Sequence, residues 1–430
     1  MITATEDVID LCRDLIRIPS VNHGDGSGPG ERAAAEFVAA ALSDVGVEPR
    51  IVESAPGRAS VLARIPGTDP SRPALLVHGH LDVVPADAAD WTHDPFGAEV
   101  ADDCIWGRGA VDMKDMDAMV LAVIRSRLRA ERLPARDVVL AFTADEEAGG
   151  VYGAHWLVDN HPDAFEGATE AIGEVGGFSV TVNQRRIYLI ESAQKGIAWL
   201  RLVAKGRAGH GSMTNDQNAV TELAAAVARI GRHEFPLHMT ATTTALLETL
   251  ADALGLPADD PDAIVARLGP LAILIGATLR NTANPTVLQA GYKQNVIPGE
   301  ATALLDARFL PGFEDELLAD LDRLLGERVR RETVHHDIAI EEPFTGGLVD
   351  AMTSALLAED PTAAVAPYCL SGGTDLKAFS RLGISGFGFS PLRLPADLDF
   401  AGMFHGVDER VPIDSLQFGT RVLDRFLDLA

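Results

Sequence analysis

The chain has 430 residues, of which 47% are hydrophobic and 23% are charged, and its formal net charge is −27. A chain of this length is too long for one simple core, so we expect two domains. The negative charge argues against nucleic acid or an anionic membrane as a partner, because both bind basic surfaces. No apolar run approaches the roughly 18 residues that a membrane-spanning helix needs.

The cysteines and the N-terminal segment indicate the compartment. Cys12, Cys104 and Cys369 lie far apart and lack the spacing of a metal or redox motif. A sparse, odd set of cysteines indicates reduced thiols rather than a disulfide framework. The N-terminal segment is acidic and amphipathic, without the basic start and apolar centre of a signal peptide. These features predict a cytoplasmic protein.

The first elements are helical. One helical face carries an apolar stripe, which predicts an amphipathic helix that ends before Pro19 and includes Val8, Leu11, Cys12, Leu15 and Ile16. A Gly-rich loop at 23–30 leads to a second helix through 37–42. The loop lacks a preceding strand and the Lys-Ser/Thr pair of a phosphate-binding loop, so we interpret it as a plain connection.

Strand-like and helical segments then alternate. Short apolar runs at 74–77, 138–142 and 171–172 predict buried strands, and residues 113–129 and 150–158 predict helices between them. Such alternation is typical of an α/β sheet that is covered by helices on both faces.

The middle of the chain has a different order of elements. It reads as a strand, a helix, two strands joined at Pro298-Gly299, a helix and a last strand, at 198–204, 218–230, 286–308, 314–325 and 333–340. This is the split-βαβ order of a ferredoxin-like domain. An Ala/Leu-rich stretch near 240–280 predicts a helical insertion.

After about residue 345 the helix-strand alternation resumes. We therefore expect one α/β domain formed by residues 1–191 and 346–430. An inserted α+β domain would comprise residues 192–345, with the helical insertion near 240–280.

The segment ALLVHGHLDVVP predicts a buried strand that ends near His80 and Asp82. Ligands of open α/β sheets bind beyond the carboxyl ends of strands. Residues two apart on an extended segment share a face, so Asp82 could hold the ring of His80, as carboxylates do for metal-bound imidazoles. A surface turn with chance histidines is the alternative, and this segment alone leaves both interpretations open.

The segment WGRGAVDMKD places Asp112 after a glycine-permitted turn and before a helix that begins near Met113. Its carboxylate could present one oxygen to each of two cations, as a bridging ligand does. Simple N-capping is the alternative, because Asp is a preferred capping residue. On this segment alone, capping is favoured.

The segment VVLAFTADEEAGG runs from a predicted strand directly into Asp145, Glu146 and Glu147. Adjacent carboxylates repel one another unless a cation or a proton compensates their charge. Neighbouring side chains point apart, so one glutamate could bind a metal while the other faces a water. A solvated acidic turn is the alternative.

Glu174 ends another short apolar run, and His405 lies in a loop near the C-terminus. Taken separately, each residue is better explained by a structural role. Oxygen and imidazole ligands without thiolates favour a catalytic zinc, manganese or cobalt site over a structural zinc.

Together these segments resemble one metallopeptidase superfamily over nearly the whole chain, including the inserted domain. The motifs in matching order are HGHLDVVP, GRGAVDMKD, TADEEAGG, the acidic position with trailing glycines at Glu174, and HGVDE. The superfamily contains aminoacylase, acetylornithine deacetylase, succinyl-diaminopimelate desuccinylase, carboxypeptidase G and carnosinase-like dipeptidases. The resemblance implies a zinc-peptidase-like mixed sheet sandwiched by helices, with a ferredoxin-like lid and dimerisation domain.

The resemblance also implies roles for the residues of these motifs. Two divalent ions, zinc first and cobalt or manganese as alternatives, would be bound by His80 and Glu174 at one position and by His405 and Glu147 at the other, with Asp112 as the bridge. Glu146 would be the general base, and Asp82 would orient His80. The peptide bond after Asp112 would be cis.

The inserted domain carries further matches. GRAGHGSM resembles the lid histidine segment, so His210 would stabilise the developing oxyanion, in many relatives at the active site of the partner subunit. This implies a homodimer formed through the lid domain. QNVIPG contributes Asn295 and LLDARFLPG contributes Arg308, whose guanidinium suits a substrate carboxylate. SGGTDLKAF matches a loop that lines the substrate pocket.

Two segments depart from the family pattern. Relatives usually have glycines after DMK, whereas Asp115, Met116 and Asp117 stand here, a change that would matter little on the outer face of the helix. GEVGG, with Glu174, replaces the more usual Asn/Asp-Glu-Gly-Gly.

The expected function is hydrolysis of an amide bond in a small peptide or N-acyl amino acid with a free carboxylate. A dipeptidase or carboxypeptidase is the first expectation, and an N-acyl-amino-acid deacylase is the alternative. The AQKG segment at 193–196 resembles the peptidase and aminoacylase branches more than the desuccinylase branch. A non-catalytic binding relative would be expected to lack Glu146 or a ligand. A two-metal phosphoesterase would need more basic groups near the motifs than Arg108 and Lys114.

Overall fold

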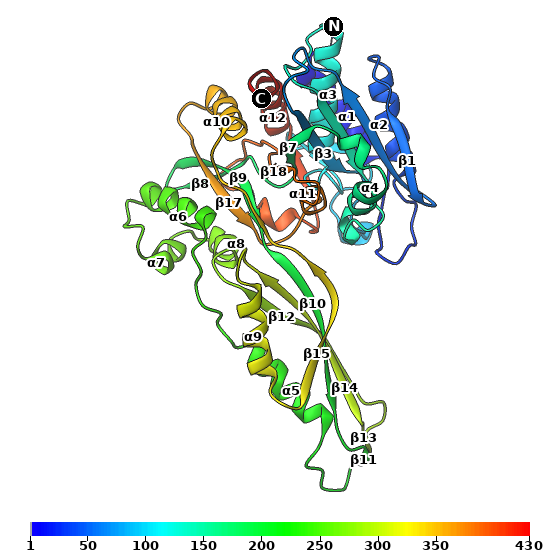
Figure 1. Cartoon of the computed structure of the whole chain (residues 1–430), viewed down its shortest axis with the longest axis vertical. Helices are drawn as coiled ribbons and strands as arrows, with labels where there is room; N and C mark the ends of the chain where they lie inside the picture. Colours follow the sequence, from blue (N-terminus) through cyan, green and yellow to red (C-terminus); the bar gives the residue numbers. More distant parts are fainter. Residues whose placement is uncertain (1) are drawn as a thin grey trace. The chain divides into compact units, whose positions relative to one another are not determined.

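The computed structural model describes residues 2–430, which form two units (Figure 1). The first unit comprises the chain up to Ser192 together with Glu342–Tyr368 and Thr374–Ala430. The second unit comprises Ala193–Glu341 and Cys369–Gly373. Each unit has its own sheet and its own helices.

The first unit is built on a mixed sheet. Its strands follow the order β1 (Arg50–Ala55), β2 (Arg58–Ile65), β6 (Val138–Thr143), β3 (Ala74–His80), β7 (Ala168–Gly173), β18 (Ser385–Gly388) and β9 (Arg185–Gln194), with β8 (Phe178–Val182) and β17 (Ala364–Leu370) also paired to β9. The pairs β3/β6, β3/β7 and β7/β18 are parallel, whereas β1/β2, β2/β6 and β9/β18 are antiparallel. The prediction of an α/β fold with a mixed sheet is confirmed.

Helices cover both faces of this sheet. Val77 of β3 lines a small apolar space with Val120 of α3 (Lys114–Arg129) and Phe426 of α12 (Ile413–Leu429). The next residue, His78, packs on Phe379 of α11 (Leu376–Ser380), with ring centroids 5.0 Å apart. Because consecutive residues of a strand point to opposite faces, α3 and α12 lie on one face and α11 lies on the other.

The remaining helices of the first unit pack around these. α1 (Ala4–Ile16) and α2 (Arg32–Ser43) contact α3, α10 (Gly347–Glu359) contacts α12, and α4 (Ala154–Asn160) contacts α11. The helices predicted before Pro19, through 37–42, at 113–129 and at 150–158 correspond to α1, α2, α3 and α4, and the predicted amphipathic face of α1 is buried. None of the helices within residues 2–430 has the length and apolarity needed to cross a lipid bilayer.

The start of α3 corrects one expectation. Asp115, Met116 and Asp117 do not lie on an outer face, because they are 1%, 0% and 1% exposed. The sheet, α1, α2 and α12 all contact α3, so its first turns have no solvent-facing side. All four carboxylate oxygens of Asp115 and Asp117 are buried without a hydrogen-bond partner.

A small three-stranded sheet joins two distant segments of the first unit. β5 (Cys104–Trp106) pairs with β4 (Glu99–Ala101) and with β19 (Arg410–Pro412), and Trp106 lies opposite Arg410. The end of β5, where the next loop begins, therefore lies beside the start of β19, where the preceding loop ends.

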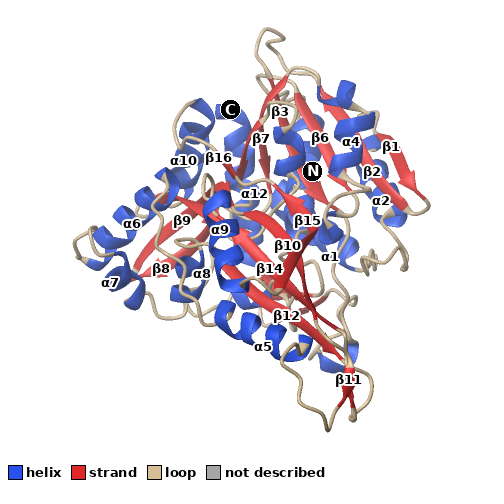
Figure 2. Cartoon of the chain, turned by 60° about the horizontal axis from the view of Figure 1, so that its bottom comes forward, coloured by secondary structure: helices blue, strands red, loops and turns tan. Residues whose placement is uncertain are grey.

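The second unit contains a four-stranded antiparallel sheet in the order β12 (Thr282–Ala290), β14 (Glu300–Phe309), β10 (Gly196–Lys205) and β15 (Val329–Asp337). α5 (Ala219–Ile230) follows β10 and α9 (Glu314–Leu325) follows β14. Both helices lie along this sheet in Figure 2. The strand order is that of the predicted split-βαβ arrangement.

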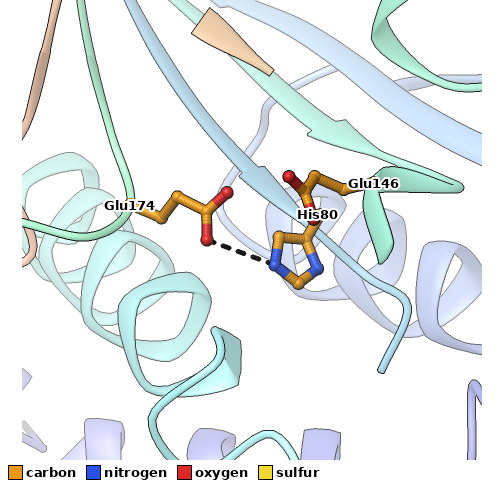
Figure 3. A group of neighbouring side chains, drawn as sticks. All are labelled: His80, Glu146 and Glu174. Atoms are coloured by element: carbon orange, nitrogen blue, oxygen red, sulfur yellow. Dashed lines mark ion pairs between the residues drawn. The ribbon is translucent and has the colours of Figure 1, made fainter. Parts of the chain in front are cut away.

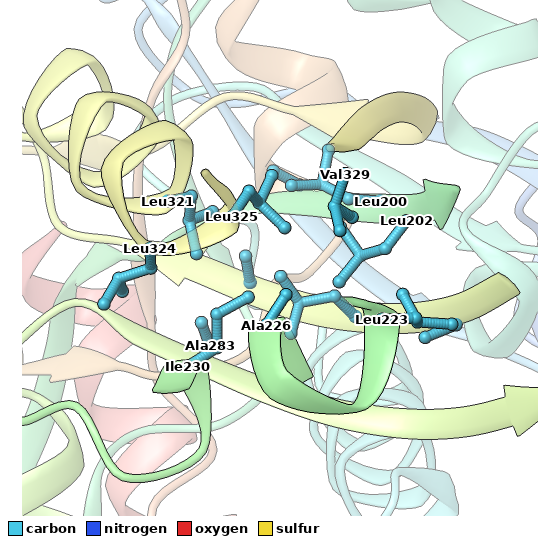
Figure 4. Packing of buried hydrophobic residues seen from close by; sticks show 14 of the residues in the cluster. Leu200, Leu202, Leu223, Ala226, Ile230, Ala283, Leu321, Leu324, Leu325 and Val329 are labelled. Carbon is cyan, nitrogen blue, oxygen red and sulfur yellow. The ribbon is translucent and has the colours of Figure 1, made fainter. Parts of the chain in front are cut away.

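The core of the second unit lies between this sheet and its two helices (Figure 4). Leu200 and Leu202 of β10 pack with Leu223 of α5 and Leu321 of α9, all at most 1% exposed. Three further helices, α6 (Ala241–Leu254), α7 (Pro261–Ala266) and α8 (Leu271–Ala277), occupy the stretch between α5 and β12. A two-stranded ribbon pairs β11 (Gly209–His210) with β13 (Val296–Ile297).

Candidate metal centre

The candidate site forms where parallel strands of the first unit end. β3 is parallel to both β6 and β7, so the carboxyl ends of the three strands lie at one edge of the sheet. β3 ends at His80, β6 runs into Glu146 and Glu147, and β7 is followed by Glu174. The sequence-predicted side chains are therefore brought together by strand order.

His80 lies at the centre of this group and is 1% exposed. Its Nε2 lies 3.4 Å from Glu174 Oε2, an approach that Figure 3 shows, and 3.1 Å from Asp112 Oδ1. Its Nδ1 lies 3.0 Å from the backbone oxygen of Asp82 and 3.6 Å from the Oδ1 of the same residue. With Nδ1–H donated to Asp82, the lone pair of Nε2 points at the carboxylates, as in a metal-binding imidazole.

Asp112 lies between two imidazoles. Its Oδ1 faces His80, and its Oδ2 lies 3.2 Å from Nε2 of His405. The same nitrogen of His405 lies 3.0 Å from Glu147 Oε2. Each oxygen of Asp112 thus faces a different histidine, which is the geometry of a bridging carboxylate. The Asp112–Met113 peptide bond is cis, as the resemblance implied.

Two overlapping sets of donor atoms could each hold an ion. One consists of His80, Glu146 and Glu174, and the other of His80, Asp112 and Glu147, with the donor atoms of each set within 4.8 Å of one another. Glu146 and Glu147 are adjacent in sequence yet belong to different sets. They follow Asp145, whose φ of 66° is the left-handed conformation that Asp tolerates better than most residues.

Asp82 fixes this turn through its carboxylate. Its Oδ1 accepts the backbone N–H of Glu146 and its Oδ2 accepts that of Glu147, both at 3.1 Å. The Nδ2 of Asn22 donates to Asp82 Oδ2 at 2.9 Å and to Asp145 Oδ1 at 3.0 Å. The carboxylate of Asp82 therefore positions the two glutamates, while its backbone oxygen makes the closer contact with His80.

Negative charge is concentrated here and shifts the acid–base equilibria. Burial and the charge of Glu174 raise the pKa of Glu146 well above its usual range. Burial and the charge of Asp112 raise the pKa of Glu147 to about 7. Hydrogen bonds to Asp112 and Glu147 raise the pKa of His405 to about 10.

Some residues of the site were not identified from the sequence. Asn22 adjoins the Gly-rich loop interpreted as a connection, and no local motif distinguishes it. Asp375, in the SGGTD segment, is buried and accepts a hydrogen bond from Thr143 at the end of β6, at 2.6 Å. Glu409 belongs to the quoted HGVDE motif, but its contacts became apparent only in three dimensions.

The residues proposed for substrate binding lie in the second unit. His210 of β11 lies opposite Val296, so Asn295 is next to it in the ribbon, and His210 Nδ1 lies 2.8 Å from Ser212 Oγ. Arg308 lies on β14 in the four-stranded sheet. Its Nε and Nη2 bind the two carboxylate oxygens of Asp306 at 2.6 and 2.9 Å.

Comparisons with known proteins find relatives over most of the chain. The family model described as peptidase family M20/M25/M40 matches residues 76–429. A probable carboxypeptidase S-like protein from Dictyostelium discoideum is 28% identical over 81% of this chain and 70% of its own length. Aminoacylase-1 from Sus scrofa is 26% identical over 94% of this chain and 90% of its own length.

Solved structures share the fold. An M20 family metallo-carboxypeptidase from Sulfolobus solfataricus matches with a TM-score of 0.76 at 20% identity, covering 98% of this chain and 99% of its own. A protein from Bacillus subtilis described as a dinuclear metal-binding peptidase of the M20 family matches with a TM-score of 0.63 at 13% identity, covering 99% and 97%. The chain belongs to peptidase family M20/M25/M40 and is an enzyme that acts on amide bonds, with both carboxypeptidase and aminoacylase relatives.

Proposed function

We propose that the protein uses two divalent metal ions to hydrolyse the amide bond of a small peptide or N-acyl amino acid that has a free carboxylate. The observation that carries the metal part is the placement of Asp112, whose two oxygens face His80 at 3.1 Å and His405 at 3.2 Å. One carboxylate shared between two imidazoles is the donor arrangement that two neighbouring cations need.

The donor set fits such ions on chemical grounds. Asp112, Glu147 and Glu174 are buried carboxylates, and each lies close to a histidine of the site. Buried like charges are costly without a compensating cation. Glu147 Oε1 is buried without a hydrogen-bond partner. Imidazole and carboxylate donors without thiolates favour zinc, with cobalt or manganese as alternatives.

We assign the five ligands as the resemblance implied. His80 and Glu174 would hold one ion, His405 and Glu147 the other, and Asp112 would bridge them. When bound, the ions would supply the positive charge that lowers the pKa of a water and polarises the amide carbonyl.

Glu146 is the proposed general base. It takes a proton from the attacking water and then passes that proton to the leaving amine, which must depart in neutral form. Its backbone N–H donates a hydrogen bond to Asp82 Oδ1 at 3.1 Å, which holds the turn in place. It shares a donor set with His80 and Glu174, which supports a place beside the reacting atoms.

The second unit is proposed to recognise the substrate. A guanidinium can grip a carboxylate with parallel hydrogen bonds, and Asp306 holds Arg308 by Nε and Nη2. We propose that the remaining N–H groups of Arg308 face the substrate carboxylate, and that Asn295 contributes to substrate binding from the ribbon that carries His210. His210 is proposed to stabilise the oxyanion that develops during attack.

A dipeptidase or carboxypeptidase is the first choice, and an N-acyl-amino-acid deacylase is the alternative. The carboxypeptidase S-like relative and the metallo-carboxypeptidase with a similar fold support the first choice. The similarity to aminoacylase-1 supports the second. Both reactions use the same base and the same ligands.

We also propose a cytoplasmic homodimer that forms through the second unit. Cys12, Cys104 and Cys369 form no disulfide bonds, which supports a reducing compartment. Trp199 and Val334 remain 42% and 59% exposed on strands of the four-stranded sheet, which supports an association surface there. Sedimentation velocity tests the dimer, and a monomer that is fully active at nanomolar concentration would reject it.

The decisive experiment is a substrate panel. Metal-depleted protein would be supplied with zinc, cobalt or manganese and assayed on dipeptides, C-terminally amidated dipeptides, N-acyl amino acids and phosphate esters. We expect metal-dependent turnover of the free-acid dipeptides, with smaller rates on N-acyl amino acids. Turnover confined to N-acyl amino acids would favour the deacylase, and full activity after metal removal would reject the two-metal proposal.

A further inference from the structure

Glu409 lies beneath the loop that carries Asp112. It is 0% exposed, and its carboxylate accepts four hydrogen bonds from that one loop. Oε1 accepts the backbone N–H of Val111 at 2.7 Å and of Asp112 at 3.2 Å. Oε2 accepts Arg108 Nη1 at 2.6 Å and the backbone N–H of Gly109 at 3.0 Å.

Arg108 extends this network to the loop that carries His405. The guanidinium is 3% exposed, and while Nη1 binds Glu409, Nη2 donates to the backbone oxygen of Gly406 at 2.8 Å. Gly406 directly follows His405. The ring of Trp91 lies under the guanidinium, 5.2 Å from its carbon to the ring centroid. One ion pair therefore contacts the backbone of both ligand loops.

The backbone reinforces the same connection. The backbone N–H of Gly107 donates to the backbone oxygen of Glu409 at 2.9 Å, and the adjacent residues Trp106 and Arg410 pair in the small sheet. The side chains of Glu409 and Arg108 extend this connection beyond the ends of the strands, to Asp112 and Gly406.

The contribution of this ion pair to the stability of the fold does not by itself explain its presence. Burying two charges costs about as much desolvation as their attraction returns, so apolar residues of similar size would stabilise the fold equally well. A buried charge pair does, however, specify one geometry, since displacing either partner leaves an unpaired charge in the core. Glu409 and Arg108 are therefore better explained by the two loops that they hold in place.

We propose that Glu409 and Arg108 are positioning residues that set the spacing between Asp112 and His405, and so shape one of the two cation positions. Asp112 Oδ2 and His405 Nε2 lie 3.2 Å apart, and each belongs to a loop that this ion pair holds. Neither Glu409 nor Arg108 is a proposed ligand or base. The inference rests on the proposed two-metal function.

The two cation positions should differ in their dependence on this pair. Glu174 follows β7 and His80 ends β3, and both are fixed by the central sheet rather than by the loops that Glu409 contacts. Asp112 bridges both positions, but only the position formed by Glu147 and His405 also depends on the His405 loop that Arg108 holds. Loss of Glu409 should therefore weaken mainly the second equivalent of metal.

The test is zinc titration of the metal-depleted protein by calorimetry, comparing wild type with Glu409→Gln. Glutamine has the same shape, but its NH₂ group would face either Arg108 and Gly109 or Val111 and Asp112, all of which are donors. We expect the first equivalent to bind within about threefold of the wild-type affinity. We expect the second to weaken by about 10- to 100-fold, the range found when groups that support metal ligands are removed.

Asp360→Asn is the matched control. Asp360 is 7% exposed in the same unit and accepts hydrogen bonds from Arg186 and Tyr188, so this change also replaces a buried carboxylate by an amide. Its contacts do not involve the candidate ligands. It should lower thermal stability and leave both zinc equivalents unchanged.

Equal binding of both equivalents by Glu409→Gln and wild type would overturn the inference, and so would an equal weakening in Asp360→Asn. If circular dichroism shows that Glu409→Gln does not fold, Arg108→Lys decides instead. That variant keeps the charge but loses the fork between Glu409 and Gly406, and it should also weaken the second equivalent. Fewer than two equivalents in the wild type would reject the proposed function itself.

Discussion

Asp82 Oδ1 accepts the backbone N–H of Glu146 at 3.1 Å, so the carboxylate at the end of one strand fixes the proposed base at the end of the next. The same carboxylate accepts the N–H of Glu147 and a side-chain N–H of Asn22. Asp82 is thus surrounded by donors, and its role depends on its being an acceptor at both oxygens.

We expect Asp82→Asn to lower kcat at saturating zinc by about 10- to 100-fold, as is usual for groups that orient metal ligands. The NH₂ group of asparagine would face a backbone N–H or Asn22, so the turn with Glu146 and Glu147 would shift. Steady-state kinetics and zinc titration measure the two effects. Asn22→Ala, which removes a donor but leaves the Asp82 side chain, is the companion variant and should show a smaller loss. Wild-type kinetics in Asp82→Asn would contradict this role.

The proposed base gives a second prediction. Glu146→Ala should still bind two equivalents of metal, because five other side chains are the proposed ligands. It should lose at least ~3 kcal/mol of transition-state stabilisation, roughly 10²-fold in kcat, since proton transfer by a positioned side chain contributes about that much or more. Calorimetry and turnover on the same preparation separate binding from chemistry. Near-normal turnover would remove Glu146 from the mechanism.

The pair of Arg308 and Asp306 leads to a prediction about substrates. Lysine lacks the planar fork that binds Asp306 through Nε and Nη2, and it is a point charge rather than a two-pronged donor. Arg308→Lys should therefore raise KM by about tenfold or more for substrates with a free carboxylate, a loss of ~1.4 kcal/mol. C-terminally amidated substrates serve as the control and should show little change. An equal effect on both substrate types would argue that Arg308 acts through structure alone.

Much of the site could be predicted from the sequence because its residues lie at the ends of strands. His80, Glu146, Glu147 and Glu174 each follow a short apolar run, and parallel pairing of those runs is enough to gather them. His405 could not be placed in this way. It comes from a loop more than 200 residues later, and only its contacts with Asp112 and Glu147 join it to the group.

Other features depended on tertiary packing that no local pattern encodes. No sequence pattern around Asp115 and Asp117 indicated that α3 is enclosed on several sides, because α1 and α12, which are distant in sequence, pack against this helix. β1 was not predicted, since residues 50–55 form an edge strand that has no buried residue and no regular alternation of polar and apolar residues. Asn22 lies in a loop, where hydrogen bonds to distant residues leave no sequence period.

The ion pair of Asp360 with Arg186 gives a prediction about pH. Burial opposes ionisation of Asp360, but hydrogen bonds from Arg186 and Tyr188 outweigh it and lower the pKa of this carboxyl. A pKa below the unfolded value of about 3.9 means that the pair stabilises the fold above that pH. This contribution is lost as the pH falls through the lowered folded-state pKa. The difference in Tm between wild type and Asp360→Asn should hence be full at pH 7 and shrink below about pH 4. A difference that is independent of pH would contradict the assignment.

The separate cores of the two units predict separate responses to mutation. Leu321 is 0% exposed and packs only with residues of the second unit, such as Leu200 and Leu223. Leu321→Ala should lower the free energy of unfolding of that unit by about 2–5 kcal/mol, because it creates a cavity in a closed core. Zinc at about 100 times its dissociation constant should instead stabilise the first unit, by about 2.7 kcal/mol. Urea unfolding with and without zinc, followed by hydrogen exchange of each unit, distinguishes the two effects. If Leu321→Ala abolished the stabilisation by zinc, the candidate ligands would not be confined to the first unit's core, and the assignment of the metal centre to the strand ends would fail with it.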